Sequence, residues 1–230
     1  MNTTEAKIYS GFSRQLQLWR DEVVRHEQRL GWKVGFALPV DQQRFELPSA
    51  LVGYLTQARH LSSGQCYRAP ATAMLKVEPE VAVLIGRDVS VGASLEQAQA
   101  AIASYAPALE LVDSTRSVHD DIEAILAGNM FHEAVLLGAP LPARAYDRKH
   151  LELSLAINGK ETSTLEHQRV PQDFSALILT VAGLLEAQGE RLLRGDWIIT
   201  GAAATPVPVQ GGDSIALDMG FMGKLKLTIG

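Results

Sequence analysis

Glycine and proline divide most of this chain into short apolar segments, and this punctuation restricts its fold more than any other feature. The segments after Gly31 have the length and composition of strands, at 81–85, 108–112, 134–137, 151–157, 197–200, 214–217 and 224–229. The dipeptide Asn158-Gly159 predicts a hairpin, because both central residues of a type I′ turn need positive φ. Strands and helices do not alternate regularly, which disfavours a doubly wound or TIM-type parallel sheet. We therefore expect an α+β fold built on a mixed β-roll or sandwich.

Three segments have the pattern of helices. The first has apolar residues at steps of three and four and is expected to end near Gly31; they are Ile8, Phe12, Leu16, Trp19 and Val23. Residues 94–105 are rich in alanine and predict a surface helix, and an apolar stripe from Phe174 to Leu185 predicts a longer helix that stops at Gly189. We expect residues 1–30 to form an N-terminal helical region and residues 31–230 to form one β-roll domain.

The charge of the chain excludes several classes of partner. The 230 residues include 21 Lys and Arg against 26 Asp and Glu, a formal charge of −5, and the positive residues are scattered singly. Binding to nucleic acid or to a membrane surface is therefore not expected. Cys66 is the only cysteine, and the first residues lack the basic and apolar regions of a secretory signal. We expect a cytoplasmic protein, and a homo-oligomer that covers the apolar stripe of the first helix.

Three carboxylates occur inside apolar strand segments, which is unusual. Glu78 and Glu80 are two residues apart and would point to the same face of a strand, and Glu110 lies within the predicted strand 108–112. Buried together, these anions would repel one another unless a cation lay between them, and a carboxylate cluster suits Mg²⁺ or Mn²⁺. Exposed carboxylates at a strand edge are the competing interpretation. The six histidines are dispersed, so zinc is not expected.

Lys33 is the second candidate for a chemical role. It lies between Trp32 and Val34, in a segment bracketed by Gly31 and Gly35, which is an odd setting for a merely solubilising charge. Burial would lower the pKa of this lysine toward the range of an acid–base catalyst, whereas a nearby carboxylate would raise it. A lysine that extends its ammonium group from a strand start into water is the alternative.

Taken together, these segments resemble the fumarylacetoacetate hydrolase superfamily, and within it the 2-keto-4-pentenoate hydratase and 4-oxalocrotonate decarboxylase branch. The resemblance runs from about Gly31 to the C-terminus and rests on motifs that occur in the same order, at residues 31–35, 78–82 with 86–88, 110–114, and 195–201 followed by 206–209 and 212–213. The fold that it implies is the mixed β-roll of the family's C-terminal domain, in agreement with the strand pattern.

The resemblance also implies a site and an activity. Glu78, Glu80 and Glu110 correspond to ligands of Mg²⁺ or Mn²⁺, and Lys33 to an active-site lysine. The metal would chelate the carboxylate and the 2-oxygen of a small 2-oxo- or 2-hydroxy-dienoic acid, and the lysine would move a proton. Three further residues are expected to contact this substrate, namely Asp113, Asn129 and Thr200. The expected activity is that of a metal-dependent hydratase, a lyase of aromatic catabolism that adds water to the dienoic acid.

Several alternatives remain open from the sequence. Decarboxylation of a 4-oxalocrotonate-like diacid would use the same residues, and the acylpyruvate-type hydrolysis of a carbon–carbon bond would need a His–Glu pair, for which only His26-Glu27 and His132-Glu133 are available. A non-catalytic member could bind oxo-acids or serve as partner of a related enzyme. Residues 128–133 and 165–173 depart from the family pattern, so the substrate pocket is expected to differ there.

Overall fold

Two sheets and a group of helices form the fold of this protein. The computed structural model describes residues 3–25, 28–115 and 121–230. The helices are α1 (Thr3–Arg25), α2 (Pro39–Arg44), α3 (Leu95–Ala101), α4 (Ile122–Ala127) and α5 (Phe174–Glu186). The strands are β1 (Arg29–Gly35), β2 (Leu51–Thr56), β3 (His60–Leu61), β4 (Cys66–Tyr67), β5 (Leu75–Ile85), β6 (Ile102–Asp113), β7 (His132–Leu137), β8 (Leu141–Pro142), β9 (Ser154–Ile157), β10 (Lys160–Thr164), β11 (Trp197–Ala202), β12 (Val207–Pro208), β13 (Ser214–Asp218) and β14 (Lys224–Ile229).

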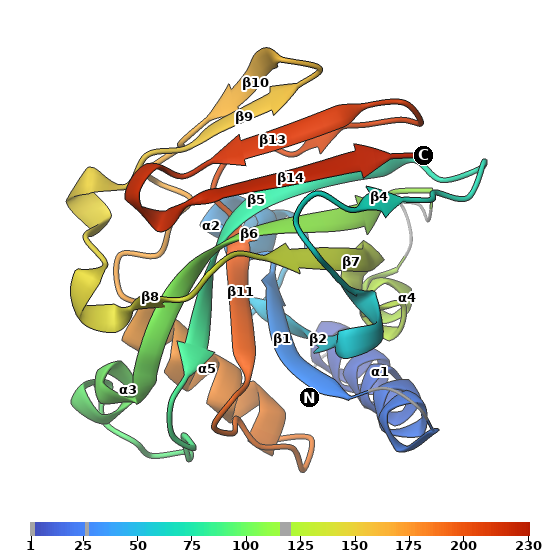
Figure 1. Cartoon of the computed structure of the whole chain (residues 1–230). Helices are drawn as coiled ribbons and strands as arrows, with labels where there is room; N and C mark the ends of the chain where they lie inside the picture. Colours follow the sequence, from blue (N-terminus) through green and yellow to red (C-terminus); the bar gives the residue numbers. More distant parts are fainter. Residues whose placement is uncertain (1–2, 26–27, 116–120) are drawn as a thin grey trace.

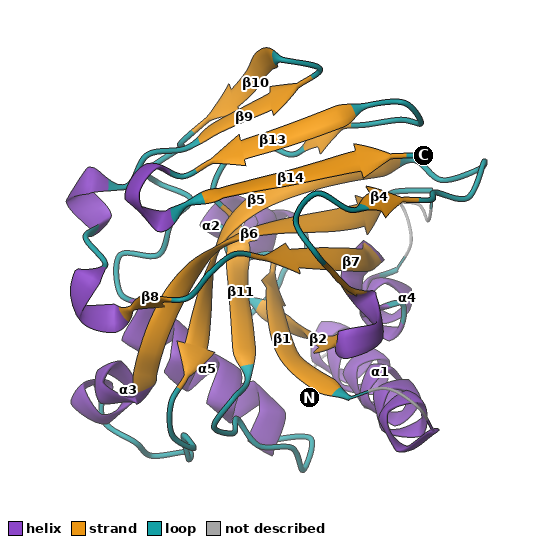
Figure 2. Ribbon diagram, viewed as in Figure 1, coloured by secondary structure: helices purple, strands orange, loops and turns teal. Residues whose placement is uncertain are grey.

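The larger sheet is mixed and curls around the core. Its strands follow the order β2-β1-β11-β5-β6-β7-β3, with β12 beside β5 and β8 beside β6, and the second sheet has the order β10-β9-β13-β14-β4. The pairs β1–β11 and β3–β7 are parallel, whereas β5 and β6 pair antiparallel along almost their whole length. Figure 1 shows the second sheet lying across one end of β5 and β6, with α1, α3, α4 and α5 gathered at the opposite side. The expected α+β fold with a mixed β-roll is confirmed, and Figure 2 distinguishes the strands of the two sheets from the helices beside them.

Most predicted strands are present with small differences at their ends. The segments 81–85 and 108–112 are the apolar inner parts of the longer strands β5 and β6, and the segment 151–157 becomes a strand only from Ser154. The hairpin between β9 and β10 is also present, with Asn158 at φ 53° and Gly159 at φ 77°. Both residues therefore have the left-handed conformation that the turn requires.

The predicted helices need two corrections. Helix α1 ends at Arg25, and Gly31 lies inside β1, where a side chain would place its Cβ 2.0 Å from the carbonyl oxygen of Trp197. The predicted helix 94–105 is helical only to Ala101, because residues from Ile102 onward are drawn into β6, where they pair with β5 and are largely buried. The third helix, α5, begins after Asp173, whose side chain caps it by accepting a hydrogen bond from the backbone of Ser175.

The apolar stripe of α1 is covered by the chain itself. Phe12, Leu16 and Trp19 are buried, and the side chain of Gln15 donates a hydrogen bond of 2.8 Å to the carbonyl oxygen of Leu126 in α4. The side chain of Val23 lies outside the described residues. The stripe therefore gives no support for a homo-oligomer, and the oligomeric state stays a prediction. Among the described helices, none has the length and apolar character needed to cross a membrane.

Candidate metal centre

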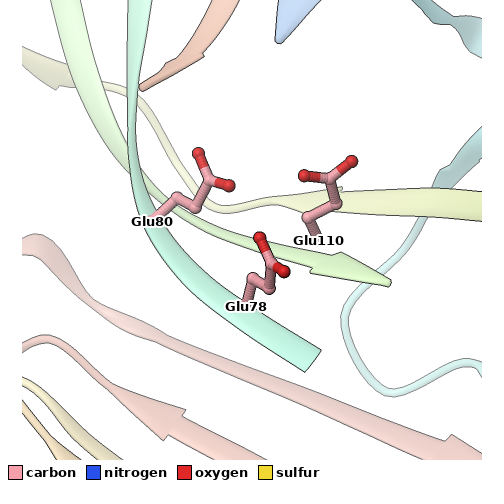
Figure 3. A group of neighbouring side chains, drawn as sticks. All are labelled: Glu78, Glu80 and Glu110. Carbon is pink, nitrogen blue, oxygen red and sulfur yellow. The ribbon is translucent and has the colours of Figure 1, made fainter. Parts of the chain in front are cut away.

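The pairing of β5 with β6 brings the three carboxylates together. Glu78 and Glu80 are two residues apart on β5, so their side chains share one face of the strand, and Glu110 of β6 pairs directly with Glu78. One oxygen of each carboxylate lies within 4.8 Å of the others, and Figure 3 shows all three groups pointing into a common space. The sequence prediction that these residues gather on one face is met by the geometry.

The environment of Glu78 and Glu80 opposes their negative charge. Glu80 is 1% exposed; its Oε2 accepts a hydrogen bond of 2.7 Å from the backbone nitrogen of Gly201, and its Oε1 has no hydrogen-bond partner in the described part of the chain. Burial and then the charges of Glu110 and Glu78 raise the pKa of Glu80 well above its ordinary value. Burial and the charge of Glu110 likewise raise the pKa of Glu78 to about 7.

Two donors hold the third carboxylate. Lys33 of β1 donates a hydrogen bond of 2.5 Å to Oε1 of Glu110, and Nδ1 of His132 lies 2.7 Å from the same oxygen. Burial acts to raise the pKa of Glu110, but the attraction of Lys33 and the hydrogen bond with His132 outweigh it, so this pKa lies below its ordinary value. Both contacts involve Oε1 of Glu110, which leaves Oε2 available to a cation.

His132 was considered from the sequence only as part of a His–Glu pair for the hydrolase alternative, and its contact with Glu110 was not predicted. It begins β7, pairs with Val112 two residues beyond Glu110, and has a side chain that is 1% exposed. Burial lowers the pKa of His132 more than Glu110 raises it, so the ring is neutral near pH 7. Its Nε2 has no partner in the described part of the chain. In the sequence, His132 is a histidine at the start of an apolar strand segment. Its contact with Glu110 can be predicted only when the pairing register of β6 and β7 is known.

The donor set fits a hard divalent cation. Carboxylate oxygens are the ligands that Mg²⁺, Mn²⁺ and Ca²⁺ prefer, and bound carboxylates are commonly held by hydrogen bonds from a second layer of residues. The buried oxygen of Glu80 without a partner and the raised pKa of Glu78 both indicate a missing positive charge. A cation between Glu78, Glu80 and Glu110 would supply it, with Lys33 and His132 orienting Glu110 from behind.

The three residues expected to contact substrate have other partners in the structure. The side chain of Asn129 exchanges two hydrogen bonds with the backbone of Tyr54, at 2.9 and 3.0 Å. Thr200 donates to the carbonyl oxygen of Val81, and Asp113 accepts from the backbone of Met74. Among the described residues that line the cavity beside the carboxylates, none is Asp113, Asn129 or Thr200. Their assignment to substrate stays a prediction, and the geometry favours a role in holding the backbone.

The side chain of Asn129 stabilises an unusual turn next to the site. Asn129, Met130 and Phe131 have φ angles of 56°, 48° and 66°, a run of left-handed backbone conformations that residues other than glycine rarely adopt. The turn aims the carbonyl oxygen of Met130 at Lys33, whose ammonium group donates to it at 3.1 Å. The sulfur of Met130 passes so close to Gly35 that a Cβ there would lie 2.8 Å away. Met130 and Phe131 of this segment form part of the cavity wall.

A cavity of about 280 Å³ opens beside the carboxylates. Its volume lies at the small end of the range for ligand pockets. Lys33, Glu78 and Glu110 line it together with the cationic residues Lys76 and Arg169. Its apolar wall is formed by Phe36, Leu38, Phe45, Ile125, Met130 and Phe131. The cavity therefore combines a cation site, a set of positive side chains and an apolar surface, which suits a small anionic organic molecule.

The chain matches the model of the fumarylacetoacetate (FAA) hydrolase C-terminal family over residues 24–230, and it belongs to that family. The match begins before β1 and includes every carboxylate of the site.

Several relatives are 4-oxalocrotonate decarboxylases. One from a Pseudomonas species is 23% identical over 207 residues, which cover 90% of this chain and 80% of the relative. Another, from Pseudomonas sp. strain CF600, is 22% identical over 206 residues, which cover 88% and 78%. The solved structure of the enzyme from Pseudomonas putida G7, complexed with magnesium and adipate, has a TM-score of 0.87 at 21% identity and covers 94% of this chain and 84% of that one. A putative fumarylpyruvate hydrolase from Burkholderia cenocepacia has a TM-score of 0.68 at 16% identity, with coverage of 89% and 88%.

Proposed function

We propose that this protein is a divalent-metal-dependent decarboxylase that acts on a 2-oxo-enedioic acid of the 4-oxalocrotonate class. The observation that carries the proposal is the clustered trio Glu78, Glu80 and Glu110, in which a buried oxygen of Glu80 has no partner among the described residues. Glu78 and Glu110 line a small cavity together with Lys33. Two curated relatives of this chain are 4-oxalocrotonate decarboxylases, which supports decarboxylation over the hydration expected from the sequence.

Magnesium is the proposed metal. The Pseudomonas putida G7 enzyme was solved once with magnesium and once with calcium, and both ions take oxygen ligands of the kind that the trio offers. When bound, a divalent cation here would chelate the 1-carboxylate and the 2-oxygen of the substrate and stabilise negative charge on that oxygen. Manganese has the same ligand preference and belongs in the same titration.

The bond changes of the proposed reaction balance without a redox partner. In a 2-oxohex-3-enedioate the C5–C6 bond breaks and C6 leaves as CO₂. The electron pair of the broken bond forms the C4=C5 double bond. The C3=C4 electrons move to form C2=C3, and the 2-oxygen receives the negative charge. Addition of one proton to that oxygen gives a 2-hydroxypenta-2,4-dienoate. Because charge develops on the 2-oxygen, donors positioned there accelerate the reaction.

Lys33 is the residue placed to hold and supply that proton. Its ammonium group is buried at the cavity wall and is fixed by Glu110 and by the carbonyl oxygen of Met130. An ammonium group has three donors, so one N–H remains for the substrate oxygen. His132 and Asn129 act on this group only through Glu110 and the Met130 turn, and they are positioning residues.

Hydration of a 2-hydroxy-2,4-dienoic acid is the second candidate, because the same cation site and the same lysine would serve it. Hydrolysis of a carbon–carbon bond has less support, since it needs a histidine that activates water. His132 is enclosed behind Glu110, and among the described residues that line the cavity there is no histidine. A non-catalytic role is disfavoured because unpaired buried carboxylates are costly to retain. Assembly with a related enzyme stays a prediction.

The test is an assay of the purified protein with Mg²⁺ and, separately, with EDTA. The substrates are 4-oxalocrotonate and 2-hydroxypenta-2,4-dienoate, with absorbance and CO₂ release followed together. We expect Mg²⁺-dependent release of one CO₂ per 4-oxalocrotonate consumed. Loss of dienoate absorbance without CO₂ would replace the decarboxylase with the hydratase. Absence of turnover on both substrates, in protein that binds Mg²⁺, would refute both assignments.

A further inference from the structure

Two positive side chains of the cavity wall have no role in holding the carboxylate trio. Lys76 lies two residues before Glu78 on β5 and shares its face of the strand. Arg169 reaches the same cavity from the loop that precedes α5. Lys76 makes no hydrogen bond or ion pair within the described part of the chain, although it is only partly exposed. The ammonium group of Lys76 is therefore available to pair with an anion that enters the cavity.

Arg169 is held so that only one edge of its guanidinium group is used. Its Nε donates a hydrogen bond of 2.7 Å to Oε2 of Glu166, and the two terminal nitrogens have no partner among the described residues. Glu166 is itself fixed, because its Oε1 accepts bonds of 2.6 Å from both the backbone nitrogen and the hydroxyl of Thr205. Hydrogen bonds from Thr205 and then from Arg169 keep the pKa of Glu166 below its ordinary value, so this anchor is charged.

The terminal edge of an anchored guanidinium group is suited to a carboxylate, which it can bind through two parallel N–H bonds. Arg169 and Lys76 line the same cavity as Glu78, so all three side chains face one enclosed space. Among the described residues, neither cation forms an ion pair with Glu78, and the ion pair of Arg169 is made with Glu166. Their remaining charge is available to a ligand.

We propose that Lys76 and Arg169 form a second anion subsite that binds the distal carboxylate of a dicarboxylic 2-oxo acid, while the carboxylate trio and its cation bind the 2-oxo-acid end. The proposal rests on the proposed function for the position of the 2-oxo-acid end. It makes Arg169 a specificity-determining residue and Glu166 its positioning residue. The loop 165–173, which departs from the family pattern, thereby becomes the part of the chain that selects diacids over monoacids.

Binding of two matched ligands tests this subsite without any need for turnover. 2-Oxoadipate and 2-oxohexanoate have the same six-carbon chain and the same metal-chelating end, and they differ only in the terminal carboxylate. Isothermal titration calorimetry with the Mg²⁺-loaded protein gives both dissociation constants. We expect 2-oxoadipate to bind about tenfold or more tightly than 2-oxohexanoate, the difference that one charge-assisted pair provides.

The variants are Arg169→Gln and Lys76→Gln, with Arg191→Gln as the matched control, because Arg191 is an exposed arginine whose ion pair with Asp88 lies outside the cavity. Each cavity variant should weaken 2-oxoadipate about tenfold and leave 2-oxohexanoate and Mg²⁺ within about twofold. Arg169→Lys, which keeps the charge and loses the fork, should fall between the wild type and Arg169→Gln. The control should bind both ligands as the wild type does.

Equal affinity of the wild-type protein for both ligands would overturn the subsite. So would an Arg169→Gln variant that weakens both ligands equally, since that result assigns the arginine to the fold or to the metal end. Failure of the proposed function has a different signature: 2-oxoadipate is preferred and the variants abolish the preference, yet 4-oxalocrotonate releases no CO₂. Release of CO₂ by a protein that does not discriminate between the two ligands would overturn only the subsite.

Discussion

Replacement of Glu78 by glutamine should stabilise the metal-free protein at alkaline pH. The raised pKa of Glu78 means that its ionisation is less favourable in the folded chain than in the unfolded one. A rise from 4.5 to about 7 corresponds to ~3 kcal/mol at pH values above 7. Glu78 is partly exposed at the cavity wall, so water screens part of this penalty and a value of ~2 kcal/mol is expected.

The direction of the pH effect follows from the same shift. An acid whose folded pKa is raised makes the folded state lose stability as pH rises from 4.5 to about 7, and the loss is complete above that range. The neutral glutamine of Glu78→Gln avoids the loss. In a chain of 230 residues ~2 kcal/mol corresponds to an increase in Tm of roughly 4–8 °C. The increase should be present at pH 8 and should largely disappear at pH 4.5.

Thermal unfolding in EDTA at both pH values measures this difference, with Glu161→Gln as a control on the exposed strand β10. A second series with Mg²⁺ completes the experiment: the wild-type protein should gain stability with the ion, and Glu78→Gln should gain much less. A metal-free Glu78→Gln protein that is less stable than the wild type at pH 8 would refute the argument. An equal Mg²⁺-induced shift in both proteins would remove Glu78 from the cation site.

Further substitutions test the neighbouring residues. Lys33→Met should abolish turnover and destabilise the metal-free protein by ~3 kcal/mol or more, because it leaves His132 as the remaining partner of the buried Glu110. Activity assays and urea denaturation measure these two effects, and normal turnover of the variant would make Lys33 a structural residue. His132→Asn should lower decarboxylation partially without removing it, and a complete loss would give the ring a direct chemical role that its enclosed position does not suggest. Asn129→Ala should cost ~2 kcal/mol in urea denaturation, since it removes two buried hydrogen bonds, whereas Asn158→Ala in the exposed hairpin should cost less.

The sequence predicted those parts of the site that depend on spacing within one strand. Glu78 and Glu80 share a face because β-strand side chains alternate, and no other information was needed. Glu110 could be placed on a buried strand, but its position opposite Glu78 depends on the β5–β6 register, which local spacing does not determine. The resemblance to a family supplied that pairing.

The residues that sequence reasoning missed depend on contacts across the sheet. His132 belongs to the site only because a register shift between β6 and β7 sets it beside Val112. Asn129 is predicted to contact substrate, and the hydrogen bond between its side chain and the backbone of Tyr54, 75 residues away, could not be read from the sequence. Residues 102–105 were predicted as helix because alanine precedes them, and the pairing with β5 overrides that local preference.

Strand β11 lies between β1 and β5, although it comes from the last fifth of the chain. Lys33 on β1 and the trio on β5 and β6 are therefore separated in the sheet by a strand that the ribosome makes late, and they reach their final spacing only when Trp197–Ala202 inserts between them. Insertion of a non-local strand is slow relative to hairpin formation. Nascent chains that end before this segment would contain the paired strands β5 and β6 with all three proposed ligands, but would lack the strand that sets the distance between Lys33 and those ligands. The contact between Lys33 and Glu110 would thus report completion of folding during synthesis.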